Sequence, residues 1–457
     1  MSLNLENLKL SRYLIDVEFY DKLRQQELVI LYSTRSGCVK IIDLFSWREI
    51  KQISSKDINL VNSLLDSKIL VHSNENELQT ILNENNQFLD NSSKLYFAIQ
   101  PTAACPLGCG YCGQLHSQKN MNSLNQLLLL ERVKNKISQG KFNALHIGWF
   151  GAEPLSGIGV IRKLSPQLQE IAAINNLKYG AKIVTNGFLL NPQLARELID
   201  EHKISMIEIT LDGIKEFHDQ RRHTKGNKPT FDKIFQNVKE LIEINNNKCH
   251  ITLRCNVDRR NQEGVTPLLH LLAEHNFQNN IKFYVAPIHS WGNDAHKLSA
   301  EKTEFSNWEI EWLSLMYQLG FKVSWIPKRK KQVCMAVDKN SELIDPSGKV
   351  FNCTEVSLVP FYEKEGTNIH ELGHVGEETL FNELHRSHFG SFYNEETLQA
   401  YSCHACPILP ICGGSCPKEW KEGRIPCPSI KFNIRERLLL AYATRLKEDK
   451  ICNQSFI

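Results

Sequence analysis

The sequence predicts an α/β fold in which a partial (β/α)6 barrel follows a small winged-helix-like module and precedes a cysteine-rich region. Two observations predict the barrel. From Leu95 onward, six short β-rich apolar runs alternate with helical periodicity, which indicates a parallel sheet with right-handed crossovers. Glycine and polar residues directly follow most of these runs, at the strand ends where such barrels carry their chemistry.

The composition favours a globular protein. The 457 residues are 42% hydrophobic and 23% charged with a formal net charge of +3, which disfavours disorder and a strongly basic nucleic-acid surface. The first residues lack a basic segment followed by an apolar run, and no run of about 18 apolar residues occurs. We therefore expect a cytoplasmic protein without nucleic-acid or membrane partners, whose 14 cysteines are metal ligands or free thiols before disulfides.

Residues 1–94 are predicted to form the winged-helix-like module and a linker. Two β-rich runs between Glu27 and Phe45 surround a Ser-Thr-Arg-Ser-Gly turn signal and predict a hairpin. Asp57 is a candidate N-cap of a helix that precedes a short closing strand. The polar run 83–94 is predicted to be the linker.

Residues 95–300 are predicted to form the barrel, with helices that include Leu124–Ser138 and Phe231–Ile244. Residues 301–333 are a connecting segment with a helix near Lys302–Leu319, and residues 334–457 end in a helix. Residues 334–430 are irregular enough to have little apolar core, for which metal clusters would substitute. The predicted barrel strands are Leu95–Gln100, Ala144–Phe150, Ala181–Thr185, Ser205–Thr210, His250–Val257 and Ile281–Pro287.

Three cysteines lie close together after the first predicted strand: Cys105, Cys109 and Cys112. A structural zinc ion, the alternative, wants four ligands, and only His116 lies nearby. A [4Fe–4S] cluster held by three thiolates would leave one iron open to bind a ligand.

This spacing, with Tyr111 directly before the third cysteine, resembles the motif of radical S-adenosylmethionine (SAM) enzymes. The resemblance implies a TIM-like partial barrel whose cluster binds SAM through the open iron. It also implies reductive cleavage of SAM to methionine and a 5′-deoxyadenosyl radical, which abstracts hydrogen from the substrate. The implied cofactor-binding residues are Tyr111, Gly151, Ala152, Glu153, Thr185, Asn186, Arg222 and Asn256.

These residues match family motifs position by position. Gly151–Pro154 resembles Gly-Gly-Glu-Pro, with Ala152 in place of the second glycine and Glu153 accepting from the SAM amino group. Thr185–Gly187 resembles a strand-end motif that approaches the SAM ribose and carboxylate. Arg222, four residues after a histidine, is implied to lie near SAM.

Seven downstream cysteines resemble the SPASM extension, which holds two auxiliary [4Fe–4S] clusters. The resemblance leaves the proximal cluster one ligand short, with an iron open to a substrate thiolate or a borrowed side chain. A pair of zinc sites is the alternative. The implied distal ligands are Cys403, Cys406, Cys412 and Cys427, and the proximal ligands are Cys334, Cys353 and Cys416. The isolated cysteines are expected to be small buried apolar residues: Cys38, Cys249, Cys255 and Cys452.

The resemblance further implies a maturase of a ribosomally made precursor peptide (RiPP), with an electron donor such as flavodoxin or ferredoxin. The N-terminal module resembles a leader-recognition element that binds the leader as an added strand; a domain that only packs on the barrel is the alternative. The product is a thioether or a carbon–carbon or carbon–oxygen crosslink. Formylglycine formation on a sulfatase, peptide epimerisation and a non-catalytic iron–sulfur leader-binding partner stay open.

No catalytic residue is assigned by the sequence. The general base that accepts the substrate's proton has four candidates: Asp258, Asp294, His289 and Glu355.

Overall fold

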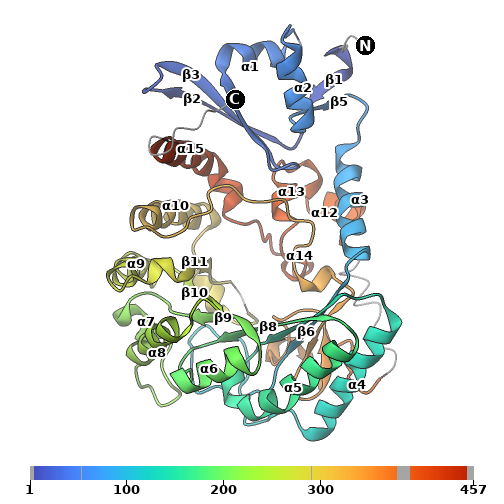
Figure 1. The fold of residues 1–457 in the computed structure, drawn as a ribbon, viewed down its shortest axis with the longest axis vertical. Helices are drawn as coiled ribbons and strands as arrows, with labels where there is room; N and C mark the ends of the chain where they lie inside the picture. Colours follow the sequence, from blue (N-terminus) through green and yellow to red (C-terminus); the bar gives the residue numbers. More distant parts are fainter. Residues whose placement is uncertain (1–4, 53, 290, 378–391, 450–457) are drawn as a thin grey trace. The chain divides into compact units, whose positions relative to one another are not determined.

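The computed structural model describes residues 5–52, 54–289, 291–377 and 392–449, which divide into two compact units (Figure 1). Unit 1 comprises Met1–Asn91, Ser324–Val337 and Ser391–Ile457, and unit 2 comprises Ser92–Val323 and Asp338–Gly390. The predicted boundaries at residues 94, 300 and 333 stay predictions.

Unit 2 is built on a sheet with the strand order β11-β10-β9-β8-β7-β6-β12-β13-β16. Strands β6 to β11 lie in chain order and pair in parallel, and β12 adds a further parallel strand beside β6. The predicted α/β fold with a partial barrel is therefore confirmed. The strands are β6 (Lys94–Ile99), β7 (Ala144–Trp149), β8 (Lys178–Thr185), β9 (Ile204–Thr210), β10 (His250–Val257), β11 (Ile281–Pro287), β12 (Ser341–Ile344), β13 (Lys349–Phe351) and β16 (Gly373–His374).

Helices in the crossovers lie around the outer side of these strands (Figure 1). Their apolar faces pack on alternate strand residues, as Leu129, Leu164 and Leu268 do in one core with Phe97 and Leu253. The helices are α4 (Ser123–Gln139), α5 (Ile158–Ile174), α6 (Pro192–Asp200), α7 (Lys215–Arg221), α8 (Phe231–Ile244), α9 (Val265–Glu274) and α10 (Lys302–Gln318).

The prediction that residues after 334 have little apolar core is wrong for β12 and β13. Leu343, Ile344 and Phe351 are buried because these strands extend the barrel sheet. Strands this short show no periodicity that sequence inspection detects.

Unit 1 contains a three-stranded antiparallel sheet, β2-β3-β4, and a two-stranded pair, β1-β5. The predicted hairpin is β3 and β4, and Asp57 caps α2 by accepting from the Leu60 amide at 3.0 Å. The elements are β1 (Leu8–Leu10), β2 (Leu14–Asp21), β3 (Gln26–Ser33), β4 (Val39–Asp43), α1 (Leu44–Lys51), α2 (Ile58–Asp66), β5 (Leu70–His72) and α3 (Glu77–Asp90).

The predicted linker at 83–94 is wrong up to Asp90, because these residues form most of α3. Asn76 caps this helix by accepting from the Gln79 amide, and Ile81, Leu82 and Leu89 are buried along one face. A few apolar residues at helical spacing outweigh a polar composition, since a surface helix needs only one buried stripe.

The N-terminal sheet shares a core with the C-terminal segment of unit 1. Ile15, Ile30 and Tyr32 are buried in one cluster with Ile411 and Leu438, and Figure 1 shows the strands near α13 and α15. None of the described helices is apolar enough over a sufficient length to cross a bilayer. The helices of this segment are α12 (Glu395–Ala400), α13 (Leu409–Cys412), α14 (Pro417–Lys421) and α15 (Ile430–Asp449).

Candidate active site

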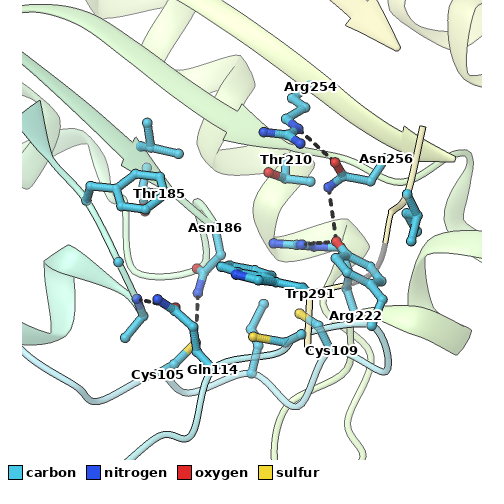
Figure 2. A pocket seen from close by; sticks show the side chains of 18 of the residues that line it. Cys105, Cys109, Gln114, Thr185, Asn186, Thr210, Arg222, Arg254, Asn256 and Trp291 are labelled. Carbon is cyan, nitrogen blue, oxygen red and sulfur yellow. Dashed lines mark hydrogen bonds between the residues drawn. The ribbon is translucent and has the colours of Figure 1, made fainter. Parts of the chain in front are cut away.

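A cavity of about 160 Å³ opens at the carboxyl ends of the unit 2 strands (Figure 2). The three cysteines of the loop after β6 line it, together with side chains at the ends of β7 to β11. All of the predicted SAM contacts except Glu153 line this cavity: Tyr111, Gly151, Ala152, Thr185, Asn186, Arg222 and Asn256.

Backbone hydrogen bonds hold the cysteine loop against the segment after α7. The amide of Gly108 donates to the carbonyl of His223 at 2.9 Å, and that of Gly110 donates to Arg221 at 3.1 Å. The amide of Lys225 returns a bond to Pro106 at 2.9 Å. The loop is therefore fixed before any ligand binds, which lowers the entropic cost of gathering three sulfurs.

The cysteine thiols have raised pKa values. Burial raises the pKa of Cys105 to about 12, with a contribution from the Glu153 carboxylate, and raises that of Cys112 to about 11. Burial also raises the pKa of Cys109. Without a metal these groups hold their protons at neutral pH, and iron binding would release them.

Ala152 occupies a backbone region that favours glycine. Its φ is +44°, directly after Gly151 at +81°, and its amide donates to Gln114 Oε1 at 2.9 Å. A Cβ on Gly151 would lie 2.2 Å from Gln100 Nε2, so only glycine fits there. The replacement of the family's second glycine by Ala152 thus keeps the left-handed turn and adds strain to it.

Glu153 lies behind the cavity and joins two strand ends. Its Oε1 accepts from the Thr185 hydroxyl at 2.7 Å and from the Leu155 amide at 3.0 Å, and its Oε2 accepts from the Asn186 amide at 2.7 Å. Burial raises its pKa although these bonds oppose the shift. One acceptor position on Oε2 is left for another donor, so its contact with the SAM amino group stays a prediction.

Tyr111 is the centre of a buried polar network. Its hydroxyl donates to Asp212 Oδ2 at 2.5 Å and accepts from Arg222 Nη1 at 2.5 Å and from Asn256 Nδ2 at 3.1 Å. The guanidinium of Arg221 lies over its ring, 5.2 Å from the centroid. The network joins three of the predicted cofactor-binding residues, and its fourth member, Asp212, was not among the predicted contacts.

Sequence reasoning missed several residues of the cavity, including Gln114, Arg254 and Trp291. Trp291 lines the same cavity as Asn186 and Arg222 (Figure 2). The Trp291 indole donates to the Glu355 carbonyl at 2.7 Å. Gln114 was detectable from its place two residues after Cys112, whereas no local pattern marks Arg254 or Trp291.

Known proteins resemble this chain in sequence and fold. The sequence model of the Radical SAM superfamily matches residues 99–271. The serine-type anaerobic sulfatase-maturating enzyme of Bacteroides thetaiotaomicron is 25% identical over 370 residues, covering 71% of this chain and 83% of that protein. The cysteine-type anaerobic sulfatase-maturating enzyme of Clostridium novyi is 24% identical over 359 residues, covering 73% and 90%. The chain carries a radical SAM domain.

The structure of native anSMEcpe with bound AdoMet shares the fold, with a TM-score of 0.59 and 17% identity over 78% of this chain and 98% of that one. The predicted resemblance to radical SAM enzymes is confirmed for the domain at residues 99–271, and this domain supports an enzyme that acts by radical chemistry. Such a domain uses one [4Fe–4S] cluster and SAM. The donor set fits this cluster, because three cysteine sulfurs line one cavity.

Two of the four general-base candidates lie at the cavity of the radical SAM domain. His289 and Glu355 line it, and His289 Nε2 lies 3.0 Å from Glu355 Oε2. Asp258 is buried between Arg221 and Arg260, each at 2.6 Å, and its pKa is lowered although burial opposes the shift. Asp294 is exposed and pairs with Lys297. Neither Asp258 nor Asp294 lines the cavity.

The four predicted distal ligands line a second cavity, of about 410 Å³, within unit 1. These are Cys403, Cys406, Cys412 and Cys427. Within the described ranges, no three His, Cys, Asp or Glu side chains lie close enough to share one metal ion. The thiolates of a [4Fe–4S] cluster bind different irons and stand further apart, so this cavity fits a cluster.

The predicted proximal ligands are divided between the units. Cys334 and Cys416 belong to unit 1, and Cys353 belongs to unit 2. This ligand set and its open iron stay predictions.

The isolated cysteines differ in burial. Cys249 and Cys255 are buried, as expected. The expectation is wrong for Cys38, which is exposed because it lies in the turn before β4. Cys452 lies outside the described residues.

Proposed function

We propose that this radical SAM enzyme installs an intramolecular crosslink in a ribosomally made precursor peptide. The observation that carries the proposal is a sheet edge in unit 1 that pairs with no further strand among the described residues, on a sheet that shares its core with the segment bearing the distal cysteines. A sheet edge binds an extended peptide through main-chain hydrogen bonds. A leader held there would raise the local concentration of the attached core peptide.

Strand β4 is the edge that fits a leader. The amide of Ser33 donates to the Cys38 carbonyl at 3.0 Å, so these residues form a hydrogen-bonded pair. The antiparallel alternation then turns the backbone of Lys40 toward β3 and that of Val39 and Ile41 away from it. The outward groups are the donors and acceptors that an added strand needs.

The opposite edge, β2, is partly covered by α15. Arg435 Nη1 donates to the Asp16 carbonyl at 2.8 Å, and the Tyr442 hydroxyl donates to Asp21 Oδ2 at 2.6 Å. At β4, in contrast, Phe45 follows the strand and is 70% exposed. An exposed aromatic side chain beside an open edge supports binding of an extended, partly apolar peptide.

The cofactor roles follow from the cysteine sets. The site cysteines Cys105, Cys109 and Cys112 would hold the cluster that supplies reductive cleavage of SAM, with an electron from a donor such as flavodoxin or ferredoxin. The distal set and the predicted proximal set would hold two auxiliary clusters that take up the second electron of the crosslinking step. The chain's own groups hold the loop, exclude water and orient the bound molecules at the strand ends.

The test is anaerobic reaction of the iron–sulfur-reconstituted enzyme with SAM, reductant and synthetic copies of short peptides encoded beside its gene. Mass spectrometry is expected to show loss of two hydrogens, and fragmentation then locates a thioether, carbon–carbon or carbon–oxygen bond. Unchanged mass with an inverted residue would indicate epimerisation. Absence of any modified peptide would contradict the proposal.

Leader binding has its own test in the β4 edge. Ile41→Pro removes an outward N–H, whereas Ile41→Ala removes the same packing and keeps the N–H. We expect fluorescence anisotropy with the labelled leader to show weaker binding for the proline variant than for the alanine variant. Equal affinities would place the leader elsewhere.

A second candidate is formylglycine formation on a sulfatase, because both curated relatives described above are sulfatase-maturating enzymes. Peptides that carry the modified serine or cysteine of a sulfatase should be tested in parallel. Their conversion to an aldehyde, with no change in the precursor peptides, would favour this function instead.

A further inference from the structure

Arg254 lines the active-site cavity. It lies on β10, and its Nε donates to Asn256 Oδ1 at 2.7 Å (Figure 2). Among the described residues, no carboxylate oxygen lies within the ion-pair distance of 4.0 Å of its guanidinium.

Arg254 is half-buried, whereas the fully buried arginines of unit 2 have such a partner. Arg132 contacts Glu342 at 2.7 Å, Arg221 contacts Asp258 at 2.6 Å, and Arg222 lies 3.8 Å from Asp212. Desolvating a guanidinium is costly unless an anion and hydrogen bonds compensate. Among the described residues, therefore, no paired anion compensates the desolvation of the Arg254 guanidinium.

The charge of Arg254 is maintained by its surroundings. Burial lowers its pKa, but Tyr284, Glu355 and Glu208 together raise it above the usual value. The two glutamates act from beyond ion-pair distance, so they favour the cation without occupying its hydrogen-bonding edge.

The backbone of Arg254 lies deeper in the barrel than the predicted SAM contacts, although its Nε reaches one of them, Asn256. Arg254 precedes Asn256 by two residues, so its backbone lies about 6–7 Å further into the barrel along β10. The cysteine loop and the predicted contacts Thr185 and Asn256 lie at the strand ends. Arg222 and Arg221 are the cations that act to lower the pKa of Cys109. An anion at Arg254 would therefore lie deeper than the SAM site.

We propose that Arg254 binds a carboxylate of the peptide substrate and so selects a substrate with an acidic group near the modified residue. The inference rests on the function proposed above. Asn256 holds the guanidinium through Nε, and the Tyr284 hydroxyl is a further neutral partner. The Nη1 and Nη2 N–H groups that these partners do not use are available to a carboxylate. The carboxylate belongs either to an Asp or Glu side chain or to the peptide's C-terminus.

The test compares Arg254→Gln and Arg254→Lys with the matched control Arg259→Gln, which alters an exposed pair with Glu304. The probes are synthetic copies of the peptide that the wild-type enzyme modifies. In one set each Asp or Glu is replaced in turn by Asn or Gln, and a further copy carries a C-terminal amide. KM for the peptide is measured for every combination of enzyme variant and peptide copy, and the dissociation constant for SAM is measured for each enzyme variant.

Arg254→Gln is expected to raise KM for the unaltered peptide by about 10- to 100-fold, the effect of losing a charged hydrogen bond. One neutral copy should show the same loss with the wild-type enzyme, and the two losses should not add. The copy that does so identifies the carboxylate as a side chain or the C-terminus. Arg254→Lys should recover part of the loss, and Arg259→Gln should show none.

Three results would overturn the inference: losses that add, neutral copies that all match the unaltered peptide, or an effect of Arg254→Gln on SAM affinity rather than on peptide KM. The last would assign Arg254 to the SAM carboxylate. Absence of any modified peptide contradicts the proposed function itself, and the inference fails with it.

Discussion

The hydroxyl of Tyr111 donates to Asp212 Oδ2 at 2.5 Å, which ties the cysteine loop to the end of β9. Asp212 Oδ1 accepts from the Asn256 amide at 2.9 Å, so the same carboxylate also holds the end of β10. The loop that bears the cluster ligands, the end of β9 and the end of β10 with its predicted SAM contact Asn256 therefore form one buried polar unit.

Tyr111→Phe tests this unit. The variant removes one hydroxyl and leaves three buried polar partners unsatisfied, so the free energy of unfolding should fall by about 1–3 kcal/mol. Urea denaturation of the apo-protein measures the loss. Tyr20→Phe, at a side chain 57% exposed, should change the free energy little, and equal effects of the two variants would contradict the network's importance.

Ala152→Gly should stabilise the protein. The left-handed backbone of Ala152 costs about 1–2 kcal/mol, of which glycine's greater unfolded-state entropy offsets about half. A rise in the midpoint of urea unfolding is the readout. Ala443→Gly, at an exposed position within α15, should instead destabilise by about 0.5–1 kcal/mol.

Asp345→Asn should remove a pH dependence of stability. Burial raises the pKa of Asp345 from 3.8 to about 6, although its carboxylate accepts from the Ser347 and Lys349 amides. The folded state thus binds this proton more tightly than the unfolded state. The contribution of Asp345 to the free energy of unfolding is therefore fully present below about pH 4 and is lost as the pH rises through about 6.

The Asn variant keeps an oxygen for the two amides and carries no charge. At pH 7 its free energy of unfolding should exceed that of the wild type by up to about 3 kcal/mol. Urea denaturation between pH 4 and 7 measures the free energy of unfolding of both proteins. If this free energy depends on pH as steeply in the variant as in the wild type, Asp345 does not have this role.

Arg132→Met tests the attachment of β12 to the barrel. Arg132 on α4 forms a two-bond pair with Glu342 on β12, and Lys136 contacts the same carboxylate at 2.7 Å. Removing the arginine alone should cost about 3 kcal/mol, because a buried carboxylate loses its main partner. The double variant Arg132→Met with Glu342→Met should recover most of the free energy of unfolding that the single variant loses. A further loss in the double variant would show that the ion pair itself stabilises the fold.

The barrel and the cluster ligands were predictable because their signals are local. A strand such as His250–Val257 shows its apolar run directly, and Cys105, Cys109 and Cys112 lie within one short motif. Ala152 was recognisable as the replaced glycine, but its left-handed backbone is visible only in the structure.

Other features depend on contacts between distant segments. Arg254 lies on a predicted strand, yet its distance from every carboxylate among the described residues depends on how distant segments fold together. His289 and Glu355 are 66 residues apart and meet only because the chain returns to the cavity after β11. The helix α3 was missed because its polar composition masked a narrow apolar stripe.

The core shared by the first and last segments of unit 1 has a consequence for biosynthesis. Ile15 and Ile30 emerge from the ribosome roughly 400 residues before Ile434 and Leu438, which complete their apolar cluster. At about 5–20 residues per second this gap lasts tens of seconds. One apolar face of the nascent N-terminal sheet therefore stays exposed to solvent during this time. A chaperone that binds this face until translation ends would favour productive folding.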